Sequence, residues 1–405
     1  MSSRRIAFIS VHGCPLARLG SKDTGGMSVY IHQMALGLAR LGFLVDIYTR
    51  AHETCQRDVQ DLGENVRVIH VRAGPRTAPK AALFNYLPRF IAGVKAFQKR
   101  HKLSYDLIHS HYWLSGHVGN VLAGEWRVPH VVTFHTMAEI KARARAGEDE
   151  GNQRSATERQ IVAAVDRIVV STPHERESLG RLYDADKHKV RVVQPGVDLD
   201  MFKPGDQRTA RDQLGLNGHH TLLYVGRLEP IKGLEVLLYT LASLETPRQV
   251  QLLVAGGGPN GEEQQRLQAL AVRLHVQDKV EFLGSLDHSL LPSYYQAADV
   301  CVVPSYYESF GLVALEAMAC GTPVVGSRVP GLEAIVKDNW SGYLVPWHCA
   351  DAFADRLEIL LANNSLRESM GEQGHSIAQD MGWSGAAIAL SQVYAELEVP
   401  SVPLS

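Results

Sequence analysis

Two series of short apolar segments, each alternating with amphipathic helical patterns, constrain the fold of this chain most strongly. In the first half the apolar segments lie at Ile6–Val11, Leu44–Tyr48, Val66–Val71, Leu107–His109, His130–Phe134, Arg167–Ser171 and Val190–Val193. In the second half they lie at Leu222–Val225, Val250–Ala255, Val280–Leu283, Val300–Val303, Pro323–Gly326 and Gly342–Leu344. Helical patterns, for example Val29–Leu41 and Ala81–His101, fall between them. This alternation predicts α/β architecture with parallel sheets covered by helices on both faces.

The segment Gln194–Pro204 separates the two series, and its two prolines and one glycine follow no regular period. Such a segment is typical of an interdomain link. We therefore predict two Rossmann-like, doubly wound domains, over residues 1–197 and 198–380, which face each other across a cleft. A terminal helix within residues 381–405 is expected to pack back on the first domain. In this architecture ligands bind at the carboxyl ends of the strands.

Composition excludes several classes of protein. The formal net charge of -2 gives no general attraction to nucleic acid or anionic membranes. The cysteines are few and never form a CxxC pair, which argues against a disulfide framework or a structural zinc site; they are Cys14, Cys55, Cys301, Cys320 and Cys349. The N-terminal residues are interpreted as a first strand rather than a signal peptide, and no apolar run is long enough to span a bilayer. A cytoplasmic protein is expected.

The segment Pro304–Gly321 carries the richest chemistry, because it follows a predicted strand and runs into a helix. Gly311 lacks a side chain, so the amides around it can approach a ligand closely; these are Ser309, Phe310, Gly311 and Leu312. Unpaired amides at a helix N-terminus favour an anion. Glu308 and Glu316 flank this turn with carboxylates that can accept hydrogen bonds from sugar hydroxyls. The alternative is a helix cap for Glu308 and a solvated helix face for Glu316.

Three further segments place polar groups at predicted strand ends. Arg227 and Lys232 follow the strand Leu222–Val225, where two cations could neutralise a diphosphate, or simply lie on the surface. Gly25 and Gly26 open the first helix and permit close packing of backbone against a phosphate. His135 follows the strand His130–Phe134, as a ligand-facing or a buried hydrogen-bonded histidine.

Three patterns point to other functions. Gly256–Gly261 satisfies GxGxxG, with Glu281 further on, so an NAD-dependent dehydrogenase remains an alternative. Its position on the second strand of its domain counts against that alternative. Asp198 and Asp200 resemble a metal-binding D-x-D pair but lie in the link, where turn chemistry is expected. The histidines His109, His111, His117 and His135 lack a carboxylate or cysteine at ligand spacing.

Together, the segments around Gly25, His135, Arg227 and Glu308 resemble the family 4 retaining glycosyltransferases of the two-domain GT-B fold. The resemblance spans nearly the whole chain. It implies that Arg227 and Lys232 bind a donor diphosphate, that Gly25 and Gly26 close on it, and that Glu308 and Glu316 hold the sugar and the ribose. It also implies that His135 contacts the donor sugar and that the loop after Gly284 receives the base. The resemblance further implies no cofactor and no essential divalent metal, and it favours a UDP-sugar over a GDP- or ADP-sugar as the donor.

A narrower resemblance concerns the acceptor. The sequences Asp23–Tyr30, His109–Gly116 and Thr133–Thr136 look like those of the D-inositol-3-phosphate glycosyltransferases. That subfamily grips the acceptor phosphate with residues that match Lys80, Tyr112, Thr136 and Arg154. Ser28 stands where the subfamily has an acceptor-contacting asparagine, which puts inositol itself in doubt. Sucrose-phosphate synthases, with fructose 6-phosphate as acceptor, share much of the pattern.

Other interpretations stay open. The cationic stretch Lys80–Lys102 is either a solvated face or a surface for peripheral contact with an anionic membrane, as in transferases that glycosylate lipids. A polysaccharide acceptor and a catalytically silent nucleotide-sugar-binding protein are further alternatives. The sequence does not fix the oligomeric state, and a homodimer is compatible with it.

Overall fold

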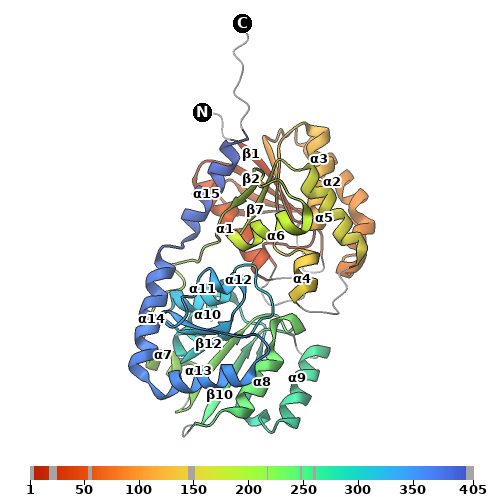
Figure 1. The fold of residues 1–405 in the computed structure, drawn as a ribbon. Coiled ribbons are helices and arrows are strands. Elements are labelled where there is room, and N and C mark those ends of the chain that lie inside the picture. Colours follow the sequence, from red (N-terminus) through yellow and green to blue (C-terminus); the bar gives the residue numbers. More distant parts are fainter. Residues whose placement is uncertain are drawn as a thin grey trace. The chain divides into compact units, whose positions relative to one another are not determined.

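The computed structural model describes residues 4–17, 25–52, 57–144, 151–216, 218–246, 249–258 and 261–397. The chain forms two compact units (Figure 1). The first comprises Met1–Ala17, Gly26–Gln194 and Trp383–Ser405, and the second comprises Arg18–Gly25 and Pro195–Gly382. The division therefore falls at the start of the predicted link, and the last helix groups with the first unit.

The first unit is built on an eight-stranded sheet with the order β3-β4-β2-β1-β5-β6-β7-β8. Its strands are β1 Arg5–Ile9, β2 Leu44–Arg50, β3 Val59–Gly63, β4 Val66–Val71, β5 Leu107–His111, β6 His130–Thr133, β7 Arg167–Val170 and β8 Val190–Val192. All seven apolar segments predicted in this half form strands, and all pair in parallel. The strand β3 was not predicted: it is an antiparallel edge strand whose partly exposed sequence, VQDLG, contains no apolar run.

Helices cover this sheet (Figure 1). They are α1 Gly26–Arg40, η1 Lys80–Tyr86, α2 Leu87–Arg100, α3 Trp113–Trp126, α4 Ala138–Ala144, α5 Asn152–Ala164, α6 Pro173–Tyr183 and α15 Trp383–Ala395. The single helix predicted over Ala81–His101 is two helices, because α2 begins with a proline in its first turn and proline cannot donate a backbone hydrogen bond.

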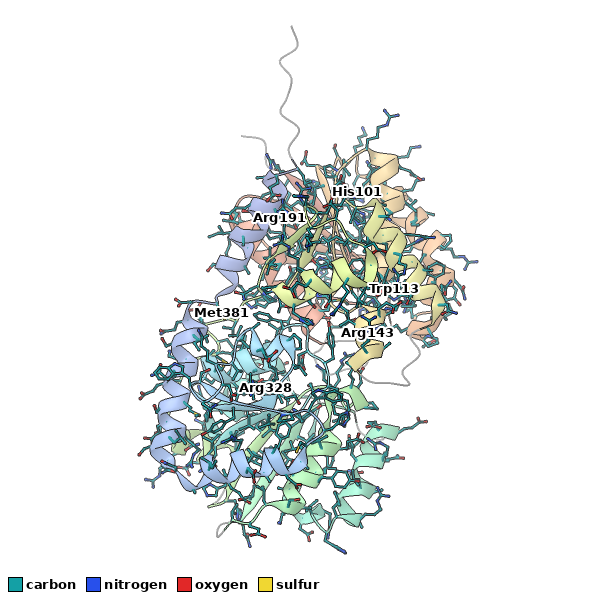
Figure 2. The ribbon with its side chains drawn as sticks, in the orientation of Figure 1. His101, Trp113, Arg143, Arg191, Arg328 and Met381 are labelled. Atoms are coloured by element: carbon teal, nitrogen blue, oxygen red, sulfur yellow. The ribbon has the colours of Figure 1, made fainter. Side chains whose placement is uncertain are left out.

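The terminal helix α15 packs against α1 within the first unit. A Cβ added to Gly37 of α1 would lie 2.6 Å from Cβ of Ala387, so glycine permits this close approach. The Tyr394 hydroxyl lies 2.6 Å from Nδ1 of the buried His109 on β5. Arg191, labelled in Figure 2, forms an ion pair of 2.8 Å with Glu396 at the end of α15. These contacts tie the end of the chain to its first half.

The second unit contains a six-stranded parallel sheet with the order β11-β10-β9-β12-β13-β14. Its strands are β9 His220–Val225, β10 Val250–Ala255, β11 Val280–Gly284, β12 Val300–Val303, β13 Val324–Ser327 and β14 Gly342–Val345. Its helices are α7 Gln207–Leu214, η2 Pro230–Lys232, α8 Leu234–Ser243, α9 Glu262–Arg273, η3 Gln277–Lys279, η4 His288–Leu290, α10 Leu291–Ala297, α11 Leu312–Ala319, α12 Pro330–Glu333, α13 Ala350–Ala362 and α14 Asn364–Gln379. All six predicted strands are present.

Both faces of this second sheet are buried. Leu222 and Val300 pack with the apolar residues of α8 and α13, whereas the neighbouring Leu223 and Cys301 pack with those of α10 and α11. Because successive side chains point to opposite faces, a strand buried on both sides is apolar throughout. This is why unbroken apolar runs predicted the strands correctly, and it confirms the parallel α/β class.

In the part of the chain that the structure describes, no helix is long and apolar enough to cross a membrane.

Candidate functional site

In the second unit the strand order reverses between β9 and β12. Ligands of doubly wound sheets bind at the carboxyl ends of the strands beside such a reversal. Gly226 and Arg227 follow β9, and the segment Pro304–Glu308 follows β12. The topology therefore brings the two richest sequence motifs to the same place.

The turn η2 fastens Lys232 to the segment after β12. The amide of Tyr306 donates to the carbonyl of Ile231 at 2.9 Å. Gly233 has a φ of +69°, and a Cβ there would lie 2.1 Å from the carbonyl oxygen of Pro304. Only glycine allows the two backbones to approach so closely. The position of Lys232 is thus set by backbone contacts.

Lys232 and Glu308, predicted from separate motifs, form an ion pair. Nζ of Lys232 lies 2.6 Å from Oε1 of Glu308, and the Ser305 hydroxyl donates to the same oxygen at 2.8 Å. Both charged side chains are mostly buried, at 21% and 14% exposure. A carboxylate held in this way can accept hydrogen bonds from a diol, while the ammonium remains close enough to attract an anion.

The turn that carries Ser309–Leu312 depends on Gly311, which has a φ of +95° and precedes α11. A Cβ on Gly311 would lie 2.6 Å from a methyl carbon of Leu332. The neighbouring Gly331 is equally constrained, since its Cβ would lie 2.3 Å from the carbonyl oxygen of Glu308. The first-turn amides of a helix have no acceptor within it. Within the described ranges no acceptor pairs with the amides of Ser309–Leu312, so the turn can present hydrogen-bond donors beside Glu308.

Glu316 lies on α11 but not on a solvated face; that alternative is wrong, because the residue is 7% exposed. Its carboxylate contacts Nε2 of His288 at 2.9 Å and accepts the Tyr295 hydroxyl at 2.9 Å. Burial opposes protonation of His288, but the hydrogen bond and the charge of Glu316 outweigh it, so the pKa of His288 is raised. Glu316 is thus held next to η4, which follows β11.

The loop after β11 is tied to the loop after β10. Gly284 has a φ of +69°, and its carbonyl accepts the amide of Gly256 at 2.8 Å. The segment expected to receive a base therefore has a defined backbone path close to the His288–Glu316 pair.

Arg227 has a different partner from Lys232. Its guanidinium pairs with Glu229 at 2.7 Å, and both side chains are partly exposed. Gly25, which groups with the second unit, lies beside it: a Cβ on Gly25 would be 3.6 Å from Nε of Arg227. Two of the predicted donor residues are therefore neighbours. Gly26 begins α1 in the first unit.

In the first unit the strand order reverses between β1 and β5, and Tyr112 follows β5 with a φ of +77°. Two cations lie against its ring, with Nζ of Lys80 at 4.5 Å and Cζ of Arg154 at 4.8 Å from the centroid. Arg154 also donates to the carbonyl and the hydroxyl oxygens of Thr136, at 2.8 and 3.2 Å. The four residues predicted to hold an acceptor phosphate therefore form one cluster.

The residues that position Arg154 were not predicted from the sequence. Its Nε donates to the fully buried carboxylate of Glu158 at 2.7 Å, and that carboxylate also accepts the hydroxyl of Tyr183 at 2.6 Å. The i,i+4 spacing of Arg154 and Glu158 on one helix was the available signal. Lys80, in contrast, has no ion-pair partner among the described residues.

Ser28 is buried at 2% exposure on α1, and its hydroxyl has no hydrogen-bond partner within the described ranges. No hydrogen bond joins it to the Lys80–Arg154 cluster in those ranges. Among the described residues, hydrogen bonds therefore do not link Ser28 to the other four predicted acceptor residues.

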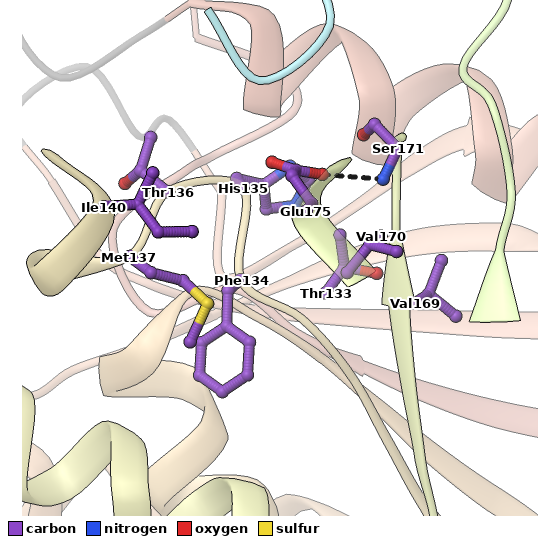
Figure 3. Close-up of a pocket in the computed structure, with 10 residues that line it drawn as sticks. All are labelled: Thr133, Phe134, His135, Thr136, Met137, Ile140, Val169, Val170, Ser171 and Glu175. Atoms are coloured by element: carbon purple, nitrogen blue, oxygen red, sulfur yellow. Dashed lines mark hydrogen bonds between the residues drawn. The ribbon is translucent and has the colours of Figure 1, made fainter. Parts of the chain in front are cut away.

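His135 follows β6 with a φ of +61°, an uncommon conformation for a residue with a side chain. Its Nε2 lies 3.1 Å from Nδ1 of His111, and the Tyr30 ring packs at 5.0 Å. Burial lowers the pKa of His135 to about 3, so its imidazole is neutral near pH 7. Figure 3 shows it in a small hollow at the ends of β6 and β7, where Glu175 accepts the amide of Ser171 at 2.8 Å.

The three competing patterns have structural explanations. Gly256 has a φ of +139°, and its Cβ would lie 1.8 Å from the Gly226 carbonyl oxygen, so this glycine is required by packing of the chain itself. Asp198 accepts the amides of Asp200 and Met201, both at 3.1 Å, as turn chemistry predicts. Both ring nitrogens of His109 lie within hydrogen-bond distance of a hydroxyl, Nδ1 of that of Tyr394 and Nε2 of that of Thr133.

Comparison with known proteins matches both halves of the chain. Residues 25–196 match the family model for a glycosyl transferase 4-like domain, and residues 206–376 match glycosyl transferases group 1. D-inositol 3-phosphate glycosyltransferase 2 of Catenulispora acidiphila is 44% identical over 403 residues, covering 96% of this chain and 94% of that protein. The D-inositol 3-phosphate glycosyltransferase of Corynebacterium glutamicum is 41% identical, covering 96% of each. The solved structure of sucrose-phosphate synthase from Thermosynechococcus elongatus has a TM-score of 0.91 and 37% identity, covering 97% of this chain and 99% of that one.

Proposed function

This chain belongs to the group 1 glycosyl transferases and is a hexosyltransferase, and we propose that it transfers glucose or N-acetylglucosamine from a UDP-sugar, with retention, to a small phosphorylated acceptor such as inositol phosphate. The proposal rests mainly on the Lys232–Glu308 pair, which lies beside the Gly311 turn where the strand order reverses.

The donor half of the proposal follows from charge and hydrogen-bonding capacity. Lys232, Arg227 and the amides of Ser309–Leu312 would bind the diphosphate; the two side chains are cations and the amides present the positive ends of their dipoles before the reaction begins. Glu308 would accept hydrogen bonds from hydroxyls of the transferred sugar, and Glu316 would accept them from hydroxyls of the ribose. Because positive groups fixed in advance stabilise charge as it develops on a leaving group, they supply much of the rate enhancement.

The transfer step then needs no nucleophile from the protein. The bond from the anomeric carbon to the diphosphate oxygen breaks, and the acceptor oxygen bonds to that carbon on the same face. The acceptor hydroxyl passes its proton to the departing phosphate oxygen. His135, neutral and oriented by His111, would position the donor sugar through hydrogen bonds. We propose that the cationic side chains and amides take the place of a divalent metal.

The acceptor half is supported by the cluster of Lys80, Tyr112, Thr136 and Arg154. Glu158 neutralises Arg154, so Lys80 leaves the cluster with a net positive charge that suits a phosphate. Fructose 6-phosphate is the second candidate acceptor, because the structural likeness to a sucrose-phosphate synthase is high. Ser28 differs from the asparagine expected of inositol-specific relatives, whereas both candidates carry the phosphate that the cluster would bind.

A binding experiment separates the classes of function. UDP at about 100 times its dissociation constant should add about 2.7 kcal/mol of stability, measured as a rise in melting temperature without magnesium, and NAD should add none. A shift with NAD alone would instead favour a dehydrogenase. UDP binding without any transfer would indicate a silent binding protein.

An activity screen then identifies the substrates. UDP-glucose and UDP-N-acetylglucosamine should each be tested with inositol phosphate and fructose 6-phosphate. Glu308→Ala should abolish turnover, whereas Glu333→Ala, an exposed glutamate on α12, should leave it normal. Near-normal transfer by Glu308→Ala would remove the role assigned to that carboxylate.

A further inference from the structure

Three metal-ligating side chains gather at the carboxyl edge of the first sheet, on a different group of strands from the proposed acceptor cluster. Cys14 follows β1, His52 follows β2, and His70 is the penultimate residue of β4. These three strands are neighbours in the sheet order β4-β2-β1. The ligand atoms of the three residues all lie within 4.8 Å of one another.

The distances suit a tetrahedral ion. Sγ of Cys14 lies 3.5 Å from Nε2 of His70. In a tetrahedral zinc site with bonds of about 2.3 Å to sulfur and about 2.0–2.1 Å to nitrogen, those two ligand atoms are about 3.6 Å apart. Cys14 and His70 therefore already have the separation that coordination requires, and the ligand atom of His52 lies within 4.8 Å of both.

The orientation of His70 also favours coordination. Its Nδ1 lies 2.8 Å from the carbonyl oxygen of Arg57, which can only accept, so Nδ1 carries the proton and the lone pair is on Nε2, facing Cys14. A backbone carbonyl that orients a histidine in this way is typical of metal sites. Cys14 and His70 are buried, at 3% and 5% exposure, whereas His52 is partly exposed.

Charged groups of both signs lie near the three residues. A thiolate would offset part of the charge of an ion, and Asp58 near His70 pairs with Arg72, while Arg50 near His52 and Arg76 near both histidines carry opposing positive charge. Cys14 and His52 also have other interaction partners, so coordination would exchange some of those contacts.

We propose that Cys14, His52 and His70 form a zinc site, with the fourth position open to water or another ligand. Thiolate with imidazole is a donor set that zinc prefers, and no ligand here is one of the residues assigned to sugar transfer. Through Cys14, His52 and His70, the ion would link the start of the β1–α1 loop to the end of β2 and to β4. Its expected effect is therefore on the stability of the first unit rather than on chemistry.

The test uses the full chain without a histidine tag. The protein is stripped with a chelator and titrated with zinc against a chromophoric competitor, and the bound metal is measured by mass spectrometry. We expect one zinc per chain and a higher melting temperature when zinc is added. Cys14→Ser, His52→Gln and His70→Gln should each weaken zinc binding at least tenfold.

Matched variants keep the result interpretable. Cys349→Ser and His174→Gln change a half-buried cysteine and an exposed histidine elsewhere, and both should bind zinc as the parent does. With cobalt in place of zinc, the thiolate-to-metal absorption should disappear in Cys14→Ser but persist in Cys349→Ser. Circular dichroism confirms that each variant is folded. Less than one tenth of an equivalent of zinc in the parent, or unchanged affinity in all three ligand variants, would overturn the proposal.

Discussion

The two units share a parallel-sheet architecture, but the polar side chains near their strand ends differ in charge. In the second unit these groups include the Lys232–Glu308 ion pair and the His288–Glu316 contact, in which Glu316 raises the pKa of His288 and so favours its charged form. In the first unit they include the imidazoles of His111, which ends β5, and His135, which follows β6; burial holds the pKa of His135 near 3 and that of His111 well below its usual range. The strand ends of the second unit therefore carry paired charged side chains, whereas those of the first unit carry neutral histidines.

This difference fits the proposed division of labour. A diphosphate and a sugar can enter the second unit by sharing partners that are already charged, so no new charge has to be buried alone. In the first unit a contact between His111 and His135 joins the residues that directly precede Tyr112 and Thr136, and Lys80 and Arg154 provide the positive charge separately.

The largest expected effect is a selective loss of stability of the first unit in acid. Unfolded histidines gain a proton at about pH 6.5, whereas burial keeps His135 and His130 neutral in the folded unit down to about pH 3. Between these values the unfolded state binds more protons, so stability falls as the pH falls, by as much as about 1.4 kcal/mol per pH unit for each such histidine. Hydrogen-exchange protection of β5 and β6 should drop from pH 7 to pH 5 more than that of β9 and β12. An equal drop in hydrogen-exchange protection in both units would contradict a selective loss of stability of the first unit in acid.

The next effect concerns the ion pairs of the second unit. Lys232→Met should lower kcat by about 10²–10³-fold, because it removes a positive group positioned at the developing charge. Steady-state kinetics with varied UDP-sugar measure this, and Lys279→Met on η3, an exposed lysine, serves as the control. Unchanged kcat in Lys232→Met would show that its pairing with Glu308 is structural only.

A structural feature could be predicted from the sequence when neighbouring residues determine it. A feature that depends on contacts between distant segments could not. Strands such as β9 and β12 were predicted because burial on both faces makes each one apolar without reference to its partners. Lys232 and Glu308 were found for a related reason, since each follows a predicted strand and Gly311 marks the turn beside Glu308. In contrast, β3 is a polar edge strand, stabilised by its pairing with β4, so its own sequence gives little signal.

The candidate site shows the same limit. Lys80, Tyr112, Thr136 and Arg154 were proposed from resemblance, and no local pattern links residues so far apart. The pairing of His111 with His135 and the cluster of Cys14 with His52 and His70 depend on the strand order, which a single sequence does not display. The expectation of no zinc site relied on close cysteine spacing, which cannot detect ligands from three separate strands.

The acceptor cluster offers a smaller effect that sharpens the comparison. Lys80→Met should raise KM for a phosphorylated acceptor about 10–100-fold with little change in KM for the UDP-sugar, because hydrogen bonds to charged groups contribute about 1.5–3 kcal/mol. Lys95→Met, which breaks an exposed ion pair with Glu125, should change neither constant. The same variant should lose most of the preference for the phosphorylated over the unphosphorylated acceptor. An equal rise in both KM values would mean that Lys80 does not distinguish the two substrates.

The smallest effect is a pH dependence of opposite sign in the second unit. Pairing with Glu316 raises the pKa of His288 in the folded state, so its stabilisation is complete below about pH 6.5 and is lost as the pH rises through the folded pKa. His288→Gln should therefore cost about 1 kcal/mol at pH 6 and less at pH 8.5, measured by denaturant unfolding followed in the second unit. A cost that is the same at both pH values would indicate a neutral hydrogen bond at Glu316. The contrast between a charged and a neutral edge would then hold only for Lys232 and Glu308.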